Sequence, residues 1–135
     1  MLNALHIRDF AIIDELELAL GPGLNVMTGE TGAGKTIIVE ALKLVLGERA
    51  STDAIRAGKE KATVTAVFDA ASMPAQLAHQ LEAAGVDAAG EVIVHRVVAE
   101  GGKGRITVNG VPVTGAMLKG FAEHLVEVSD RKSVV

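Results

Sequence analysis

The chain has 135 residues and no cysteine, which leaves room for one compact domain and excludes disulfides and thiolate metal sites. Its 13 basic and 17 acidic residues, with no Trp or Tyr and only three Phe, exclude a global positive field and an aromatic stacking platform for nucleic acid. Because it shows neither a signal peptide nor a long apolar segment, we expect a soluble cytoplasmic protein that makes no membrane contact and touches nucleic acid only through a local patch.

The start of the chain predicts three strands and a turn. Residues 2–8 and 12–20 read as strands, and in the second of them apolar and polar residues alternate clearly. A Gly-Pro-Gly turn follows at 21–23. Residues 24–27 then form a brief apolar strand that leads into a glycine-rich loop.

The middle of the chain predicts two helices separated by a strand. Residues 37–46 are apolar almost all round, which is typical of a buried helix, and Gly47 would end it. Residues 62–68 alternate as a strand. Residues 74–84 are amphipathic and should form a second helix, closed by Gly85.

The last third predicts a hairpin and a final helix. Residues 91–99 and 105–109 are strands joined by a Gly-rich tip, and an Asn-Gly turn follows the second. Residues 114–125 read as a helix with Thr114 as its N-cap. We expect one more strand to begin at 125–128.

The glycine-rich loop carries the clearest chemistry. Its sequence, GETGAGKT, matches G-x-x-x-x-G-K-[ST] between a strand and a helix. The glycines let successive N–H groups turn inward toward phosphates, and the helix adds the positive end of its dipole. Lys35 supplies a charge for the outer phosphates, and the Thr36 hydroxyl is a ligand for Mg²⁺. The loop thus predicts a nucleoside triphosphate site made of Gly29, Glu30, Thr31, Gly32, Ala33, Gly34, Lys35 and Thr36.

The sequence around this loop resembles a known family. LNALHIRDFAIIDELEL, the loop itself, GERAS, AIRAG, ATVTAVFD, GRITVNGVPV and LVEV are together similar to the N-terminal head segment of RecN-type bacterial DNA-repair proteins. These are SMC-like, ABC-type ATPases. The resemblance extends to about residue 128, and its combination of stretches is far more specific than the P-loop alone.

The resemblance implies an α/β fold, an ABC-type P-loop head lobe with a mixed sheet and an antiparallel β portion. Residues 1–128 would be the N-terminal half of a split head, and residues 129–135 a tail leading toward a coiled coil or the end of the chain. It also implies ATP and Mg²⁺ as cofactors and a nucleoid-associated location. The implied partners are the C-terminal half of the same head, a second head in an ATP-dependent homodimer, and DNA.

No catalytic residue is assigned to this chain. In the family, the signature motif, the Walker B aspartate and the catalytic glutamate belong to the C-terminal half. The family also has a His-Gly-Gln-His stretch where this chain has residues 129–132, Ser-Asp-Arg-Lys. We therefore transfer no glutamine role to Arg131.

Two arginines outside the loop are further candidates for binding nucleotide. In SMC-like heads an arginine from the connection after the P-loop helix reaches nucleotide or DNA, which points to Arg49. Related heads place the end of the first strand beside adenine and the γ-phosphate, which points to Arg8. Each has a structural alternative as a solvated charge, and the same choice applies to Arg56. Phe10, at the end of the same first strand as Arg8, is expected to pack in the core.

Other polar residues are read as structural. Asp69 ends an apolar strand as a Walker B aspartate does, but the alternation before it indicates an antiparallel strand. Lys103 and Arg105 flank a hairpin tip, where most charges are solvated, although such a tip can touch a phosphate backbone. The four histidines show no spacing typical of a metal site or triad.

Two other functions remain open from the sequence. One is a small P-loop kinase or nucleotide transferase, which would need an acceptor pocket and an arginine-bearing lid. The other is a non-catalytic module that dimerises or binds DNA and is only stabilised by ATP. A GTPase is disfavoured because no Asn-Lys-x-Asp motif occurs.

Overall fold

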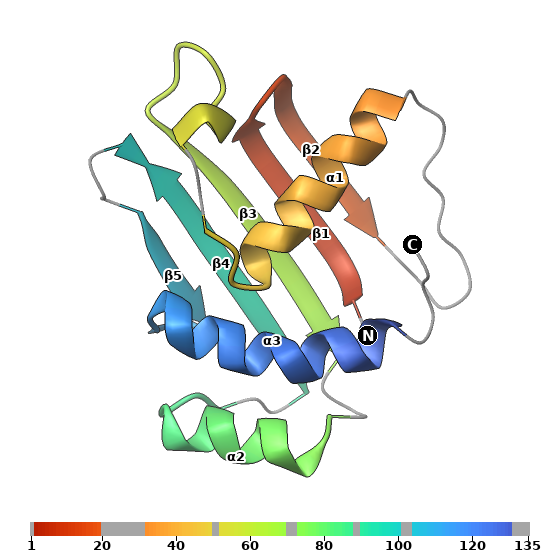
Figure 1. The fold of residues 1–135 in the computed structure, drawn as a ribbon, viewed down its shortest axis with the longest axis vertical. Helices are drawn as coiled ribbons and strands as arrows, with labels where there is room; N and C mark the ends of the chain where they lie inside the picture. The colour runs from red at the N-terminus through yellow and green to blue at the C-terminus, as the bar shows by residue number, and fades with distance from the viewer. Residues whose placement is uncertain are drawn as a thin grey trace.

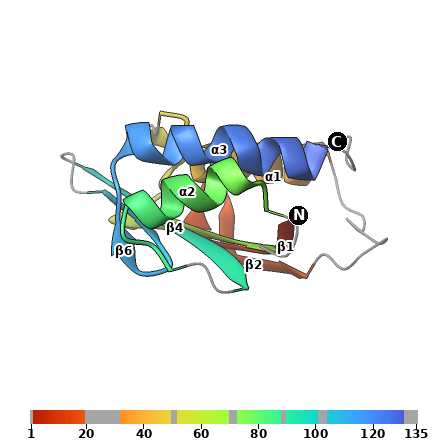
Figure 2. The ribbon, with the colours of Figure 1, turned by 90° about the horizontal axis from the view of Figure 1, so that it is seen from below.

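The computed structural model describes residues 2–19, 32–49, 52–69, 73–87, 90–100 and 104–130, and it arranges them as one sheet with helices on one face (Figures 1 and 2). In chain order the elements are β1 (Leu2–Phe10), β2 (Ile13–Ala19), α1 (Gly32–Val45), the 3-10 helix η1 (Thr52–Ala54), β3 (Lys61–Asp69), α2 (Ala75–Ala83), β4 (Glu91–Ala99), β5 (Arg105–Val108), β6 (Val111–Pro112) and α3 (Gly115–Asp130).

The sheet has six strands in the order β2-β1-β3-β4-β5-β6, and every pairing among the described residues is antiparallel. Burial alternates along the central strand β3, where Ala62, Val64, Ala66 and Phe68 are buried and the residues between them are half-buried. This is the pattern of an antiparallel sheet packed on one face only. The strand expected at 24–27, which would make the sheet mixed, lies outside the described residues.

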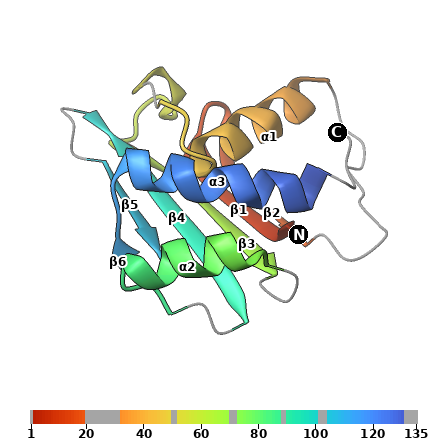
Figure 3. The same cartoon turned by 60° about the horizontal axis from the view of Figure 1, so that its bottom comes forward.

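The core lies between the sheet and the three helices. Leu5 and Ile7 of β1 belong to one buried apolar cluster with residues of α1, α2 and α3, in which α1 packs on β3 and β4 and α2 packs on α3. Helix α3 lies between α1 and α2, as Figure 3 shows. The helical residues that form this buried layer are Ala41, Leu44 and Val45 of α1, Leu77 and Leu81 of α2, and Leu118, Phe121 and Ala122 of α3.

The tip of the β1–β2 hairpin is tied to the segment after η1. Asp9 and Ala11 adopt positive φ angles of 53° and 54°. The backbone N–H of Ala11 donates to the carbonyl of Ala54 at 2.6 Å, and that of Arg56 donates to Asp9 at 2.9 Å. The Arg56 guanidinium adds a bond of 2.7 Å to the carbonyl of Ile12. Arg56 therefore has a structural role in joining these two segments. This agrees with the structural alternative to nucleotide binding that the sequence analysis gave for it.

Most predicted elements are confirmed, but the strand at 125–128 is wrong. Helix α3 continues through that segment to Asp130. Apolar residues at 118, 121, 122 and 125 follow the helical spacing, and after Gly120 the segment contains no glycine or proline that would end a helix. The predicted N-cap is confirmed, since the Met117 N–H donates to the Thr114 hydroxyl at 3.0 Å. Strand β6 was not predicted.

Within the described ranges, none of the helices has the length and apolar character needed to cross a bilayer.

Substitution of Gly47 by alanine should destabilise the fold strongly. Gly47 has φ +98°, and an added Cβ would lie 2.8 Å from the Lys119 Cα. Gly58 has a similar φ of +86° but meets nothing within 4 Å, so Gly58→Ala is the matched control. We expect about 1 kcal/mol lost for Gly58→Ala and about 3 kcal/mol for Gly47→Ala in urea unfolding. Equal losses would contradict the close approach of α1 and α3.

Candidate functional site

The N-terminus of α1 lies inside the glycine-rich motif. The helix begins at Gly32, so Gly32, Ala33, Gly34, Lys35 and Thr36 form its first turn, and no acidic residue is present in that turn. The first N–H groups of a helix have no partner within the helix, and the dipole makes this end positive. The backbone therefore offers donors of the kind that a phosphate accepts. Residues 29–31 of the motif lie outside the described residues.

Helix α1 is held by one buried side. Ala41, Leu44 and Val45 are buried against β3 and β4, while Glu40 and Lys43 are exposed and form an ion pair of 3.6 Å. This packing fixes the axis of the helix on the sheet. The direction in which the first turn points is thus set by the sheet.

The C-terminal end of α1 is closed by a Schellman motif. The Glu48 N–H donates to the Lys43 carbonyl at 3.0 Å, and the Gly47 N–H donates to Leu44 at 3.2 Å. Gly47 supplies the left-handed backbone that this turn requires. Its role as the end of the helix, predicted from the sequence, is confirmed.

Arg96 binds the same end of α1 from the sheet. One guanidinium nitrogen donates to the carbonyls of Leu44 and Glu48, each at 2.7 Å. Burial lowers the pKa of Arg96 from its ordinary value. A positive charge beside the C-terminal carbonyls interacts favourably with the negative end of the helix dipole, and its donors add hydrogen bonds to carbonyls beyond those made by the turn itself. Arg96 anchors α1 to β4.

Sequence reasoning missed Arg96, although a signal was present. In β4 the residues at 92, 94 and 98 are buried valines, and position 96 belongs to the same row. An arginine in an otherwise apolar row of a strand needs partners for its donors. Here those partners are the carbonyls of Leu44 and Glu48 at the end of α1.

Arg8 lies on the face of the sheet opposite α1. Leu5 and Ile7 point to the core, so the alternation places Arg8 on the other side, where it is exposed and pairs in register with Glu15. The hydrogen bond with His6, 2.9 Å long, lowers the pKa of Glu15, and the charge of Arg8 acts in the same direction. The structure does not bring Arg8 to the first turn of α1.

Arg49 lies at the other end of the helix from the motif. It follows Glu48, which is held at the C-terminal end of α1. With 14 residues and a rise of about 1.5 Å per residue, α1 is roughly 20 Å long. Arg49 is exposed there and is not brought to the first turn. A nucleotide contact by Arg49 or Arg8 stays a prediction.

The other residues considered in the sequence analysis have positions that agree with a structural role where the structure describes them. Asp69 ends β3, which lies antiparallel between β1 and β4 and so lacks the parallel setting of a Walker B strand. Phe10 is 3% exposed and belongs to the core. Arg105 is exposed at the start of β5, and Lys103 is outside the described residues. No three His, Asp or Glu side chains of the described part could together hold a metal ion.

Comparison with protein families and sequences gives matches over most of the chain. The model of an AAA domain family matches residues 4–130. The chain is 39% identical over 132 residues to a DNA repair protein RecN of Haemophilus influenzae, covering 96% of this chain and 24% of that protein. It is 40% identical over 129 residues to the RecN of Bacillus subtilis, covering 95% and 22%. The chain thus spans about a quarter of the length of these relatives.

Comparison with solved structures shows the fold. A chain from work on ATP-driven dimerization and DNA-stimulated activation of SMC ATPases aligns with a TM-score of 0.73 at 22% identity, covering 99% of this chain and 84% of that one. The Smc head domain of Pyrococcus furiosus gives 0.71 at 20%, covering 91% and 32%. RecF bound to ATPrS gives 0.66 at 17%, covering 87% and 29%. The expected fold, that of an SMC-like, ABC-type P-loop head, is confirmed.

Removal of the Arg96 anchor should destabilise the protein. Arg96→Met keeps an apolar stem but removes the charged donor that the carbonyls of Leu44 and Glu48 share, and Leu44 then keeps the bond from the Gly47 N–H. We expect a loss of about 2 kcal/mol in urea unfolding, as is usual for hydrogen bonds to a charged group. Arg105→Met, an exposed arginine on the neighbouring strand, is the control and should change the free energy of unfolding by less than about 0.5 kcal/mol. A similar loss in both variants would refute the anchoring role.

Proposed function

This chain belongs to the AAA domain family, and from that premise we propose that it is the ATP-binding N-terminal segment of a RecN-like ATPase head. The relatives named DNA repair protein RecN support this assignment, as does the likeness to SMC heads and RecF. The activity proposed for the whole protein is ATP-dependent work in DNA double-strand-break repair and recombination.

One observation carries the nucleotide site. Helix α1 begins within the GAGKT stretch, so its unpaired amides and its positive end lie at Gly32–Thr36. In the proposed site these amides bind phosphate oxygens, and Lys35 adds a point charge. Thr36 supplies a hydroxyl to Mg²⁺, which would neutralise part of the triphosphate charge when bound. Gly29, Glu30 and Thr31 complete the loop in this proposal.

Hydrolysis is proposed to require more than this chain. No residue of the chain is assigned to position the attacking water, so the C-terminal half of the head and a second head would supply the missing groups. Dimerisation with that second head and contact with DNA belong to the same proposal. The division into an N-terminal half of the head at residues 1–128 and a tail at 129–135 belongs to the same proposal.

Replacing Lys35 should weaken nucleotide binding selectively. Lys35→Ala removes the point charge from the first turn, whereas Lys43→Ala removes an exposed lysine from the same helix, nearer its C-terminal end. Titration with Mg·ATP followed by NMR should show at least a tenfold weaker affinity for Lys35→Ala, equivalent to about 1.4 kcal/mol. Lys43→Ala should bind as the original chain does.

Two results would contradict the proposal. One is the absence of saturable Mg·ATP binding to the original chain up to about 10 mM, a concentration that detects even very weak complexes. The other is an equal effect of both lysine variants. A saturable phosphoryl transfer from ATP to a small acceptor would instead favour a kinase or transferase. Binding without hydrolysis in the longer protein would favour the non-catalytic module.

A further inference from the structure

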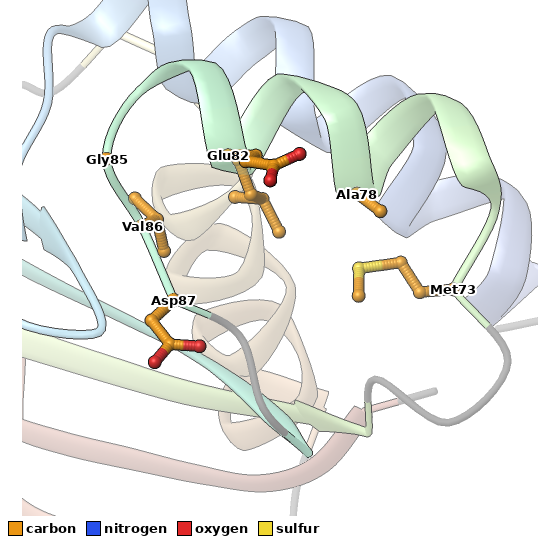
Figure 4. A pocket seen from close by; sticks show the side chains of 7 residues that line it. Met73, Ala78, Glu82, Gly85, Val86 and Asp87 are labelled. Carbon is orange, nitrogen blue, oxygen red and sulfur yellow. The ribbon is translucent and has the colours of Figure 1, made fainter.

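A pocket of about 530 Å³ lies beside α2, which α3 separates from α1 (Figures 3 and 4). Leu81 of α2, Val86 and Met73 give it an apolar lining, and the carboxylates of Glu82 and Asp87 belong to the same lining. In Figure 4, Met73 lies across the hollow from Val86 and Asp87, with Glu82 on α2 between the two sides. The pocket therefore combines an apolar surface with two negative groups.

The apolar part of the pocket is fixed by the end of α2. The Val86 N–H donates to the Leu81 carbonyl at 2.8 Å, and the Gly85 N–H donates to Glu82 at 3.0 Å. With Gly85 at φ +81°, this is a Schellman motif, which brings the residue after the glycine against the last turn of the helix. Leu81 and Val86 are accordingly 1% and 5% exposed. This side of the pocket is preformed.

The other side is held by Asn109. Its side-chain amide donates to the carbonyls of Asp87 at 2.8 Å and Glu91 at 3.0 Å, and its oxygen accepts from the Ile93 N–H at 2.6 Å. Asn109 itself has a φ of 50°, a conformation that asparagine tolerates better than most residues. One side chain thus ties the backbone at Asp87 to the start of β4.

The stretch of sequence that contains the pocket lining is acidic, and two of its carboxylates, Glu82 and Asp87, line the pocket. Residues 62–95 contain four acidic residues, Asp69, Glu82, Asp87 and Glu91, and no Lys or Arg. Of 17 acidic residues, 13 (17 less 4) lie elsewhere and equal the 13 basic residues, so this segment carries the whole net charge of −4. The ion pairs found within the described ranges do not include Glu82 or Asp87.

We propose that this pocket docks a lysine or arginine side chain of a protein partner. The aliphatic stem of such a residue would lie on Leu81, Val86 and Met73, and its charged head would meet Glu82 and Asp87. Charge complementarity selects this occupant, because a phosphate backbone would be repelled. The volume is within the usual range of sites for small ligands and is large enough to admit one long side chain. The inference does not rest on nucleotide binding, which is proposed at α1.

A pair of isosteric peptides tests the charge requirement. Ac-Leu-Arg-Leu-NH₂ carries the proposed side chain, and Ac-Leu-citrulline-Leu-NH₂ has nearly the same shape without the charge. In NMR titrations of the 135-residue chain, we expect saturable shifts of the amides of Glu82, Gly85, Val86 and Asp87. The arginine peptide should bind at least about tenfold more tightly than the citrulline peptide, as charge-assisted hydrogen bonds predict.

Two double variants separate the pocket from the general charge of the chain. Glu82→Gln with Asp87→Asn should remove the preference for the arginine peptide. Asp14→Asn with Glu60→Gln makes the same change of charge at exposed positions outside the pocket lining and should keep the preference. The fold of each variant is checked by its far-UV circular dichroism.

Several results would overturn the proposal. Equal affinity for the two peptides would do so, as would the absence of saturable shifts up to about 10 mM peptide. Shifts of the same amides on adding duplex DNA would contradict the statement that the pocket repels a phosphate backbone. Shifts that depend on protein concentration alone would assign the pocket to a second copy of the chain.

Discussion

The attachment of α1 to the sheet at its C-terminal end is the constraint on which the arrangement depends. Arg96 holds the carbonyls of Leu44 and Glu48, and Gly47 allows the chain to turn where α3 leaves no space for a side chain. The buried side of α1 then sets its direction along the sheet. A helix held at one end presents the other in a fixed place, and in this chain that other end begins within the glycine-rich motif. Phosphate binding by backbone amides requires such a fixed terminus.

Local patterns predicted most of the fold, because antiparallel strands with one buried face show their alternation directly in the sequence. The alternation of β3 and the glycines that end α1 and α2 were sufficient for those elements. The segment at 125–128 was misread because four residues rich in valine suit a strand by themselves. The helical spacing with residues 118–122 decides otherwise, and that relation is visible only over a longer window.

The candidate site was predictable only where a single motif carries its chemistry. GETGAGKT specifies a helix terminus and its charge in eight consecutive residues. Arg8 and Arg49 were assigned by resemblance, and their positions depend on which sheet face and which helix end they occupy. The structure places them away from the first turn of α1, on the opposite face and at the opposite end. Arg96 could have been found by a different argument. An arginine that faces the core must have acceptors for its N–H groups, and the end of a helix is a place where such acceptors occur.

The outer strands of the described sheet limit how this molecule can join others. β2, at one edge, carries exposed Asp14, Glu15 and Glu17, and β6, at the other, has two residues, one of them Pro112, which has no N–H to donate. Charged or very short border strands discourage a foreign strand from extending a sheet. Assemblies that include this chain are therefore expected to form through sheet faces and helix surfaces, and not by extension of the described sheet.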